Sequence, residues 1–297
     1  LTSGQLTIRA NAGDITVAGA ASFANAGGVM LHAGEGNLAV NAALTTTSLL
    51  ALQAGNQIGQ GAGGLITAPE VEARARTVDL SQANAVGAIS GHANLGAFNF
   101  GASGDLAVGF VGNTSGITTS DAEIVLNAGG KLAVDRTLDA GAGMLDLTGA
   151  GIVTGPEAML RGESVRLFST GGVGTADAAV TTNAAYLAVD NNHAGASVIN
   201  IRNTGVLALG PVVQSGAGST GAIKIDNTGT MTVPEFDRYE TGAGVRVRSG
   251  AGAILLASSE ALTINGRVES ASGNIALEAG GDGLLDIGAS GVVTASA

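Results

Sequence analysis

Short triplets of the form apolar–x–apolar recur along the whole chain. Examples are Leu6-Thr-Ile8, Leu38-Ala-Val40, Leu106-Ala-Val108, Leu132-Ala-Val134 and Leu187-Ala-Val189. Because side chains alternate between the two faces of a β-strand, the outer residues of each triplet are predicted to point inward and the middle residue outward. We therefore expect Val40, Val108, Val134 and Val189 to be buried and equivalent triplets to stack in columns. A lone triplet is too short to form a stable hairpin.

The spacing between triplets alternates between a short and a long step. The step from Ile254 to Leu262 is short and the step from Leu262 to Ile275 is long, and the same two steps recur after Ile124. One short and one long step give a coil of about 21 to 22 residues, which falls in the range of solenoid repeats. Stacked coils bury their apolar faces and pair their backbones in parallel ladders. The expected fold is all-β: a right-handed parallel β-helix (β-solenoid) of roughly 13 coils, continuous over residues 1–297.

Glycine ends the short turn after many of these strands. The pattern occurs as Leu31-His-Ala-Gly34, Leu52-Gln-Ala-Gly55, Leu126-Asn-Ala-Gly129 and Leu277-Glu-Ala-Gly280. Glycine adopts the positive φ that a sharp turn requires. No window combines helical spacing of apolar residues with helix caps. The sequence therefore predicts strands and turns and no long helix.

The composition fits a long, narrow core. The chain has 49 Gly, 4 Pro, no Cys and no Trp, and 3% aromatic residues, so Val, Ile, Leu and Ala must fill the interior. The net charge of −11, from 13 basic and 24 acidic residues, argues against nucleic acid or an anionic membrane surface as a partner. Polar residues interrupt every apolar run, so no membrane-spanning segment is expected. The chain begins in mid-pattern at Leu1, and we expect it to be an internal fragment of a longer protein.

The repeats resemble those of a known family. The runs Leu-Asn-Ala-Gly-Gly-Lys-Leu-Ala-Val at 126–134 and Ile-Gly-Gln-Gly-Ala-Gly-Gly-Leu-Ile-Thr-Ala at 58–68 are similar to the shaft repeats of filamentous-haemagglutinin-like large exoproteins, which are two-partner-secretion adhesins. The resemblance is one of repeat style and covers essentially the whole chain. It implies export through an outer-membrane secretion pore, a place at the bacterial cell surface or outside the cell, and roles in adhesion, biofilm or cell contact. The partners that it implies are a glycan or protein on a host or neighbouring cell, and other shafts of the same kind.

Motifs for cofactors, metals and catalysis are weak. Gly59–Gly64 and Gly216–Gly221 match G-x-G-x-x-G, but neither match opens a helical pattern, which phosphate binding by that motif needs. The three histidines, His32, His92 and His193, are far apart and no cysteine is present, so no metal-ligand spacing occurs. We therefore predict no cofactor, no metal ion and no catalytic residue.

The densest charged and aromatic stretch is Pro234-Glu-Phe-Asp-Arg-Tyr-Glu240. It breaks the Gly and Ala rhythm and is expected to form a loop that leaves the solenoid. Tyr and Arg are enriched among residues that dominate binding energy. The residues that we expect to contact a partner are Glu235, Asp237, Arg238, Tyr239, Glu240, Arg246 and Arg248.

The function expected from these observations is a structural or adhesive shaft without enzymatic activity. Two alternatives remain open. A polysaccharide lyase or hydrolase on a β-helix would need clustered carboxylates at fixed separation on adjacent coils. A phage tailspike or a toxin-delivery filament is the other alternative.

Overall fold

The computed structural model of the chain describes residues 4–24, 26–239 and 244–296. The chain is a parallel β-solenoid of about 13 turns, and no helix occurs in the described residues. Accordingly, none of these residues belongs to a helix that could cross a membrane. The predicted all-β solenoid is confirmed, while right-handedness stays a prediction. The chain divides into two compact units. We call residues 1–145 with 155–158 unit 1, and residues 146–154 with 159–297 unit 2.

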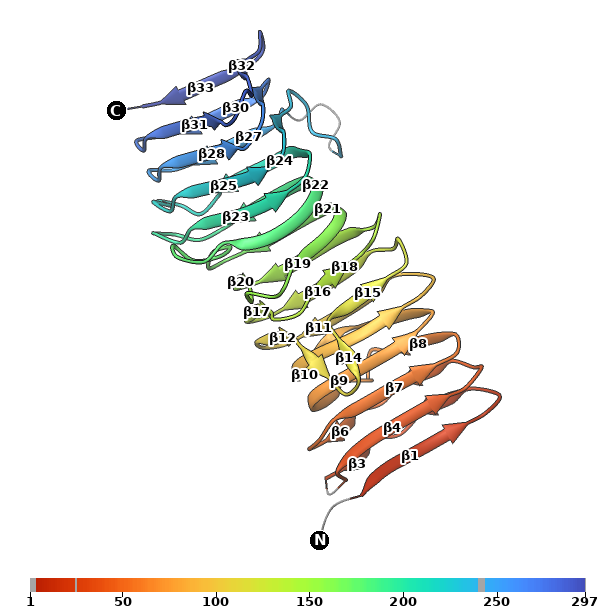
Figure 1. Ribbon diagram of the computed structural model, residues 1–297. Helices are drawn as coiled ribbons and strands as arrows, with labels where there is room; N and C mark the ends of the chain where they lie inside the picture. Colours follow the sequence, from red (N-terminus) through yellow and green to blue (C-terminus); the bar gives the residue numbers. More distant parts are fainter. Residues whose placement is uncertain (1–3, 25, 240–243, 297) are drawn as a thin grey trace. The chain divides into compact units, whose positions relative to one another are not determined.

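Three strands make up a coil in unit 1, and each pairs in parallel with the equivalent strand of the next coil (Figure 1). One coil holds β4 (Gly28–Ala33), β5 (Leu38–Val40) and β6 (Leu44–Thr46). The strands that stack on them are β7 (Leu50–Ala54), β8 (Gln57–Gln60) and the start of β9 (Ile66–Ala75). The third strand of each coil lies inside the long step, where the triplet spacing had indicated no strand.

Unit 2 repeats this three-strand arrangement. Each strand of one coil pairs in parallel with the equivalent strand of the next coil, which continues the backbone ladder. The strands are β28 (Ile254–Ser258), β29 (Leu262–Ile264) and β30 (Arg267–Ser270), followed by β31 (Ile275–Ala279), β32 (Leu285–Ile287) and β33 (Val292–Ala295).

The core consists of stacked apolar columns. Leu106 of β12 (Leu106–Val108) pairs with Leu132 of β17 (Lys131–Val134), and Val108 pairs with Val134. All four side chains are buried, as are Val40 and Val189, whereas the alanine in the middle of each triplet is partly exposed. Burying a Val or Leu side chain contributes about 1.5–3 kcal/mol. The predicted inward register and stacking are therefore confirmed for these residues. Leu6 and Ile8 of the first strand are exposed (37% and 41%), although they pair with the buried Val29 and Leu31.

Coil length varies more than the sequence pattern suggested. Ile254 pairs with Ile275, which fits the expected period, but the coil that pairs Val71 with Ile89 is shorter. The coil that pairs Phe98 with Ile124 and the coil that pairs Ile223 with Ile254 are longer than the expected period. Each of these two contains an insertion that leaves the wall. The insertions are the hairpin of β13 (Phe110–Val111) with β14 (Thr114–Ser115), and residues 234–239 with 244–245.

Buried asparagines hold the turns of successive coils in register. Asn203 Nδ2 donates to Asn227 Oδ1 at 2.8 Å, and Asn203 Oδ1 accepts from the Ala184 N–H at 3.0 Å. Both asparagines are fully buried, so these bonds supply the partners that buried amides require. These turns end at Gly205 and Gly229, whose φ angles are 112° and 128°.

The glycines that the sequence pattern singled out have another role. The predicted positive φ is wrong for Gly34, Gly55, Gly129 and Gly280. A Cβ atom at these positions would lie 2.2–3.0 Å from a backbone carbonyl oxygen of the preceding coil, so glycine is needed there for the close approach of two backbones.

Candidate functional site

Residues 234–239 leave the wall after β26 (Met231–Val233), and residues 244–245 lead into β27 (Arg246–Ser249). These described residues are called the loop below. Its two arms pair at the base through an antiparallel bridge between Phe236 and Gly244. Phe236 is 59% exposed and Tyr239 is 49% exposed, whereas Asp237 is only 8% exposed. The loop therefore turns back onto the wall at Asp237. Glu240 lies outside the described residues.

Asp237 is bound by Tyr186 of β22 (Val180–Asn191). The Tyr186 hydroxyl lies 3.1 Å from Oδ1 and 3.0 Å from Oδ2 of the carboxylate, and the Tyr239 N–H donates to Oδ1 at 2.7 Å. The rings of Tyr186 and Tyr239 meet edge to face, with centroids 4.8 Å apart and planes at 78°. Tyr186 shares the outward face of β22 with Ala188, yet it is 2% exposed because the loop covers it.

A β-bulge next to Tyr186 makes room for its ring. β22 pairs with β24 (Leu207–Gln214) so that Leu187 lies opposite Leu209, but Val189 lies opposite Val212. One extra residue therefore stands on β24, at Gly210 and Pro211. A Cβ atom on Gly210 would lie 2.1 Å from the Tyr186 hydroxyl oxygen, so a glycine is required for this close approach.

The environment of Tyr186 fixes its protonation state. Burial, followed by the hydrogen bond and negative charge of Asp237, raises the pKa of Tyr186 well above its ordinary value. The phenol therefore keeps its proton at neutral pH and acts as a hydrogen-bond donor to Asp237. It is not suited to serve as a general base.

A pocket of about 340 Å³ opens beside this contact. Four strands form its floor, namely β19 (Met144–Gly149), β21 (Leu160–Ser169), β22 and β24, and the loop forms one wall. Phe168, Asp190 and Val213 lie on three successive rungs of the ladder, which in parallel sheets are about 4.8 Å apart. Asp190 Oδ1 accepts a hydrogen bond from the Ser215 hydroxyl. The side chains that give the pocket its chemistry are Asp146, Arg166, Phe168, Asp190 and Tyr239.

The structure separates the remaining predicted contact residues. Arg238 forms an ion pair with Glu163 at 2.9 Å, with both side chains about half exposed, so this bridge stabilises the loop only weakly. Glu235 is exposed. Arg246 and Arg248 are exposed on β27 and line a different depression of about 600 Å³ with the turn at 214–218.

Of the predicted contact residues in the described part of the chain, Asp237 and Tyr239 line the pocket beside Tyr186. Asp237 directs its carboxylate at Tyr186 inside the protein, and Tyr239 stands at the rim. Tyr186, Arg166, Asp146 and Asp190 also line this pocket and were not among the predicted contact residues. One signal was present, since Tyr186 is one of only two tyrosines in the chain. The others are ordinary outward positions of strands, and only the stacking of the coils brings them together.

In the described residues, neither the histidines nor the G-x-G-x-x-G matches have the geometry of a metal or nucleotide site. Within the described part of the chain, no group of three or more His, Cys, Asp or Glu side chains could hold a metal ion. Gly59 lies in β8, and residues 61–64 form the turn after it; Gly216 and Gly218 lie in a turn as well.

Comparison of the chain with protein families, with curated proteins and with solved structures gives no match.

Proposed function

We propose that this chain is a structural and adhesive shaft of a secreted bacterial surface protein, and that it contacts a glycan at the pocket beside Tyr239. The observation that carries the proposal is the Tyr186–Asp237 contact, which fixes an inserted loop against the wall and builds a pocket with mixed polar and aromatic chemistry. The resemblance of the repeats to filamentous-haemagglutinin-like exoproteins supports export through an outer-membrane pore, a place at the cell surface, and contact with other cells or other shafts.

The side chains of the pocket suit a sugar. Tyr239 and Phe168 present aromatic surface, being 49% and 38% exposed, and an aromatic face packs well against the apolar face of a pyranose ring. Asp146 and Asp190 offer acceptors for sugar hydroxyls, while Arg166 offers five N–H donors. Ligand sites combine apolar surface with a few convergent polar groups in this way.

The alternative function is a polysaccharide lyase or hydrolase. One observation favours it: the carboxylates of Asp146 and Asp190 line the same pocket as Arg166, and paired carboxylates are what glycoside hydrolysis requires. Two observations favour binding without cleavage. Asp190 is engaged by the Ser215 hydroxyl, and Tyr186, which stays protonated, is not available as a base.

The test is binding of the protein to a panel of neutral and acidic polysaccharides, with cell-adhesion counts alongside. We expect Tyr239→Ala to weaken glycan binding by roughly tenfold, as for a residue at the centre of a binding site. Phe110→Ala is the matched control, because Phe110 is an exposed aromatic residue (63%) on the hairpin of unit 1. Equal binding by wild type and Tyr239→Ala would contradict the pocket assignment. Cleavage of any polysaccharide, detected as new reducing or unsaturated ends, would contradict the non-enzymatic proposal.

A further inference from the structure

Between His32 and Thr118, one outward column of unit 1 consists of basic and neutral polar side chains. The backbone ladder places His32 of β4 next to Gln53 of β7, then Arg74 of β9, His92 of β10 (Thr77–Ala93) and Thr118 of β15 (Ile117–Thr119). Asp139 of β18 (Leu138–Asp139) follows Thr118 on the next coil and does not line the groove described below. Residues at one register position of parallel strands point to the same side. Five consecutive coils therefore present these side chains in a single row.

Four side chains of this row, His32, Gln53, Arg74 and His92, line a groove of about 460 Å³. Arg76 and Asn94 line its edge, and no Asp or Glu is among the described residues that line it. The chain as a whole carries 24 acidic and 13 basic residues. A groove with two arginines, two histidines and no carboxylate therefore departs from the average surface of this protein, and it would attract a negatively charged ligand.

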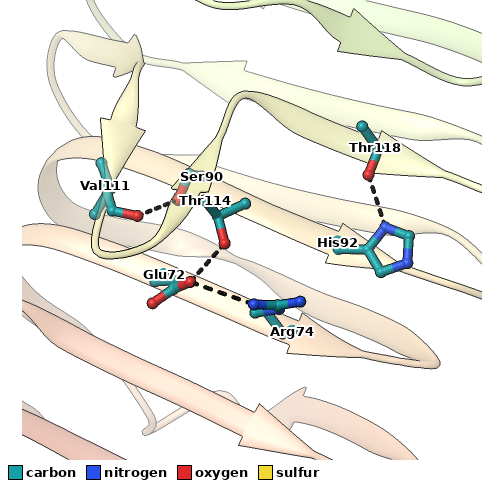
Figure 2. A network of polar contacts seen from close by, with 7 residues as sticks. All are labelled: Glu72, Arg74, Ser90, His92, Val111, Thr114 and Thr118. Atoms are coloured by element: carbon teal, nitrogen blue, oxygen red, sulfur yellow. Dashed lines mark hydrogen bonds and ion pairs between the residues drawn. The ribbon is translucent and has the colours of Figure 1, made fainter.

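The carboxylate of Glu72, next to Arg74 on the outward face of β9, is covered by the hairpin of β13 and β14. Glu72 lies one outward position before Arg74 on β9 but is only 2% exposed. The hairpin of β13 and β14 lies over it: the Thr114 hydroxyl donates to Glu72 Oε1, and the Ser90 hydroxyl donates to the Val111 carbonyl at 3.0 Å (Figure 2). The hairpin therefore removes the Glu72 carboxylate from the surface beside the groove.

Arg74 and His92 are both positioned for a ligand. Arg74 Nη1 lies 4.0 Å from Glu72 Oε1, and the arginine side chain is 48% exposed, so this single long contact leaves most of its five donors to meet a ligand. His92 Nδ1 lies 2.6 Å from the Thr118 hydroxyl (Figure 2). Because that contact fixes the ring, Nε2 is the ring nitrogen that a ligand in the groove would meet.

We propose that this groove, formed by His32, Gln53, Arg74, Arg76, His92 and Asn94, binds an acidic polysaccharide whose sugars carry carboxylates. The chain of sugars lies across the strands, so that successive carboxylates meet rungs separated by multiples of about 4.8 Å. Guanidinium groups hold carboxylates in a two-pronged geometry, and the amides of Gln53 and Asn94 serve the sugar hydroxyls. Double-stranded DNA carries one charge per about 1.7 Å of its axis, a higher charge density than one carboxylate per sugar. It therefore meets more repulsion from a chain with a net charge of −11. The groove lies in unit 1, so the proposal does not depend on the Tyr239 pocket of unit 2.

The test is calorimetric titration of the whole chain with oligogalacturonate and with the same oligosaccharide after reduction of its carboxyl groups. We expect oligogalacturonate to bind and the reduced form not to bind. Arg74→Gln and Arg76→Gln should each weaken binding at least about fivefold, and added NaCl should weaken it further. Arg202→Gln is the matched control because Arg202 is an exposed arginine of unit 2, and it should bind as wild type does.

Two variants make the test independent of folding and of the first proposal. Arg76 does not contact Glu72, so Arg76→Gln leaves the bonds of Glu72 to Thr114 and Arg74 in place. A loss of binding in this variant therefore reports on the groove and not on a change of fold. Tyr239→Ala should bind oligogalacturonate as wild type does, which separates this groove from the Tyr239 pocket. The proposal is overturned if wild type fails to bind, if Arg74→Gln and Arg76→Gln bind unchanged, or if a sulfated polysaccharide or a polyphosphate binds more tightly than the carboxylated one.

Discussion

The Tyr186 hydroxyl donates to the carboxylate of Asp237, although 51 residues separate the two along the chain. Tyr186 is an outward residue of a wall strand and Asp237 belongs to the inserted loop. The same principle is seen in unit 1, where Thr114 of the hairpin donates to Glu72 of the wall. In both cases an insertion covers an outward polar side chain and hydrogen-bonds to it, which holds the insertion against the solenoid.

Tyr186→Phe should loosen the loop while leaving the coils intact. The substitution removes the hydroxyl that Asp237 accepts from, and a buried carboxylate with fewer partners destabilises the protein by about 1–3 kcal/mol. Urea denaturation measures the loss, and limited proteolysis at Arg238 should become faster. Tyr239→Phe is the control, because the bond from residue 239 to Asp237 comes from the backbone N–H, and it should change stability little.

The stability of the fold should decrease at alkaline pH. The unfolded phenol ionises near its ordinary pKa of about 10, whereas burial and Asp237 raise the pKa of Tyr186 in the folded protein. Above about pH 10 the unfolded state therefore binds fewer protons than the folded state, so the free energy of unfolding falls as the pH rises. Urea midpoints at about pH 8 and about pH 11 should differ more for wild type than for Tyr186→Phe.

Tyrosinate absorbance measures the ionisation of Tyr186 directly and tests the raised pKa of its phenol. The chain has two tyrosines, so in Tyr239→Phe the only tyrosinate signal comes from Tyr186. We expect this signal to stay low while the variant is folded and to rise when it unfolds. If Tyr186 ionised near the ordinary tyrosine pKa of about 10 in the folded variant, that result would contradict the buried hydrogen bond.

Gly210→Ala should disturb the Tyr186 contact from the opposite side. The added methyl group would lie 2.1 Å from the tyrosine oxygen and 2.4 Å from Cζ, so the ring or the bulge must move, at a cost of about 1–3 kcal/mol. Thermal denaturation measures the change. Gly104→Ala is the matched control, since a Cβ atom there has no neighbour within 4 Å; similar stability of the two variants would argue against the close packing.

Val134→Asp tests the inward register of the core. Val134 is fully buried in a column with Val108, and an unpaired carboxylate there costs several kcal/mol, on the order of 2–7. Ala133→Asp places the same group on the outward, partly exposed position and should be tolerated. Circular dichroism on heating compares the two; equal melting temperatures would refute the register.

Ser164→Ala should be neutral or slightly stabilising, by up to about 1 kcal/mol. The Ser164 hydroxyl oxygen is buried without a hydrogen-bond partner among the described residues. Ser169 provides the contrast, because its hydroxyl donates to the Gly172 carbonyl at 2.8 Å and accepts from the Gly172 N–H at 3.0 Å. Ser169→Ala should therefore destabilise the fold, and a urea series on both variants distinguishes the two cases.

The sequence by itself determined the class of fold and the inward face of its strands. Triplets such as Leu132-Ala-Val134 alternate with period two, and two triplets with the glycines between them recur about once per coil, so alternation and spacing are properties of neighbouring residues. It also marked the loop at 234–240 as an exception to the repeat. The third strand of each coil was missed because it shows a weaker pattern, as in Arg267–Ser270, where Val268 is the one apolar residue.

The tertiary structure alone decided what meets on the surface. The coils differ in length, from the short one that pairs Val71 with Ile89 to the long one that pairs Ile223 with Ile254, so a fixed period does not give the partner of a particular residue on the next coil. The row from His32 to His92 and the pairing of Tyr186 with Asp237 both depend on that register. Burial shows the same limit: Glu72 and Tyr186 occupy outward positions by sequence, and they are buried because insertions much further along the chain fold back over them.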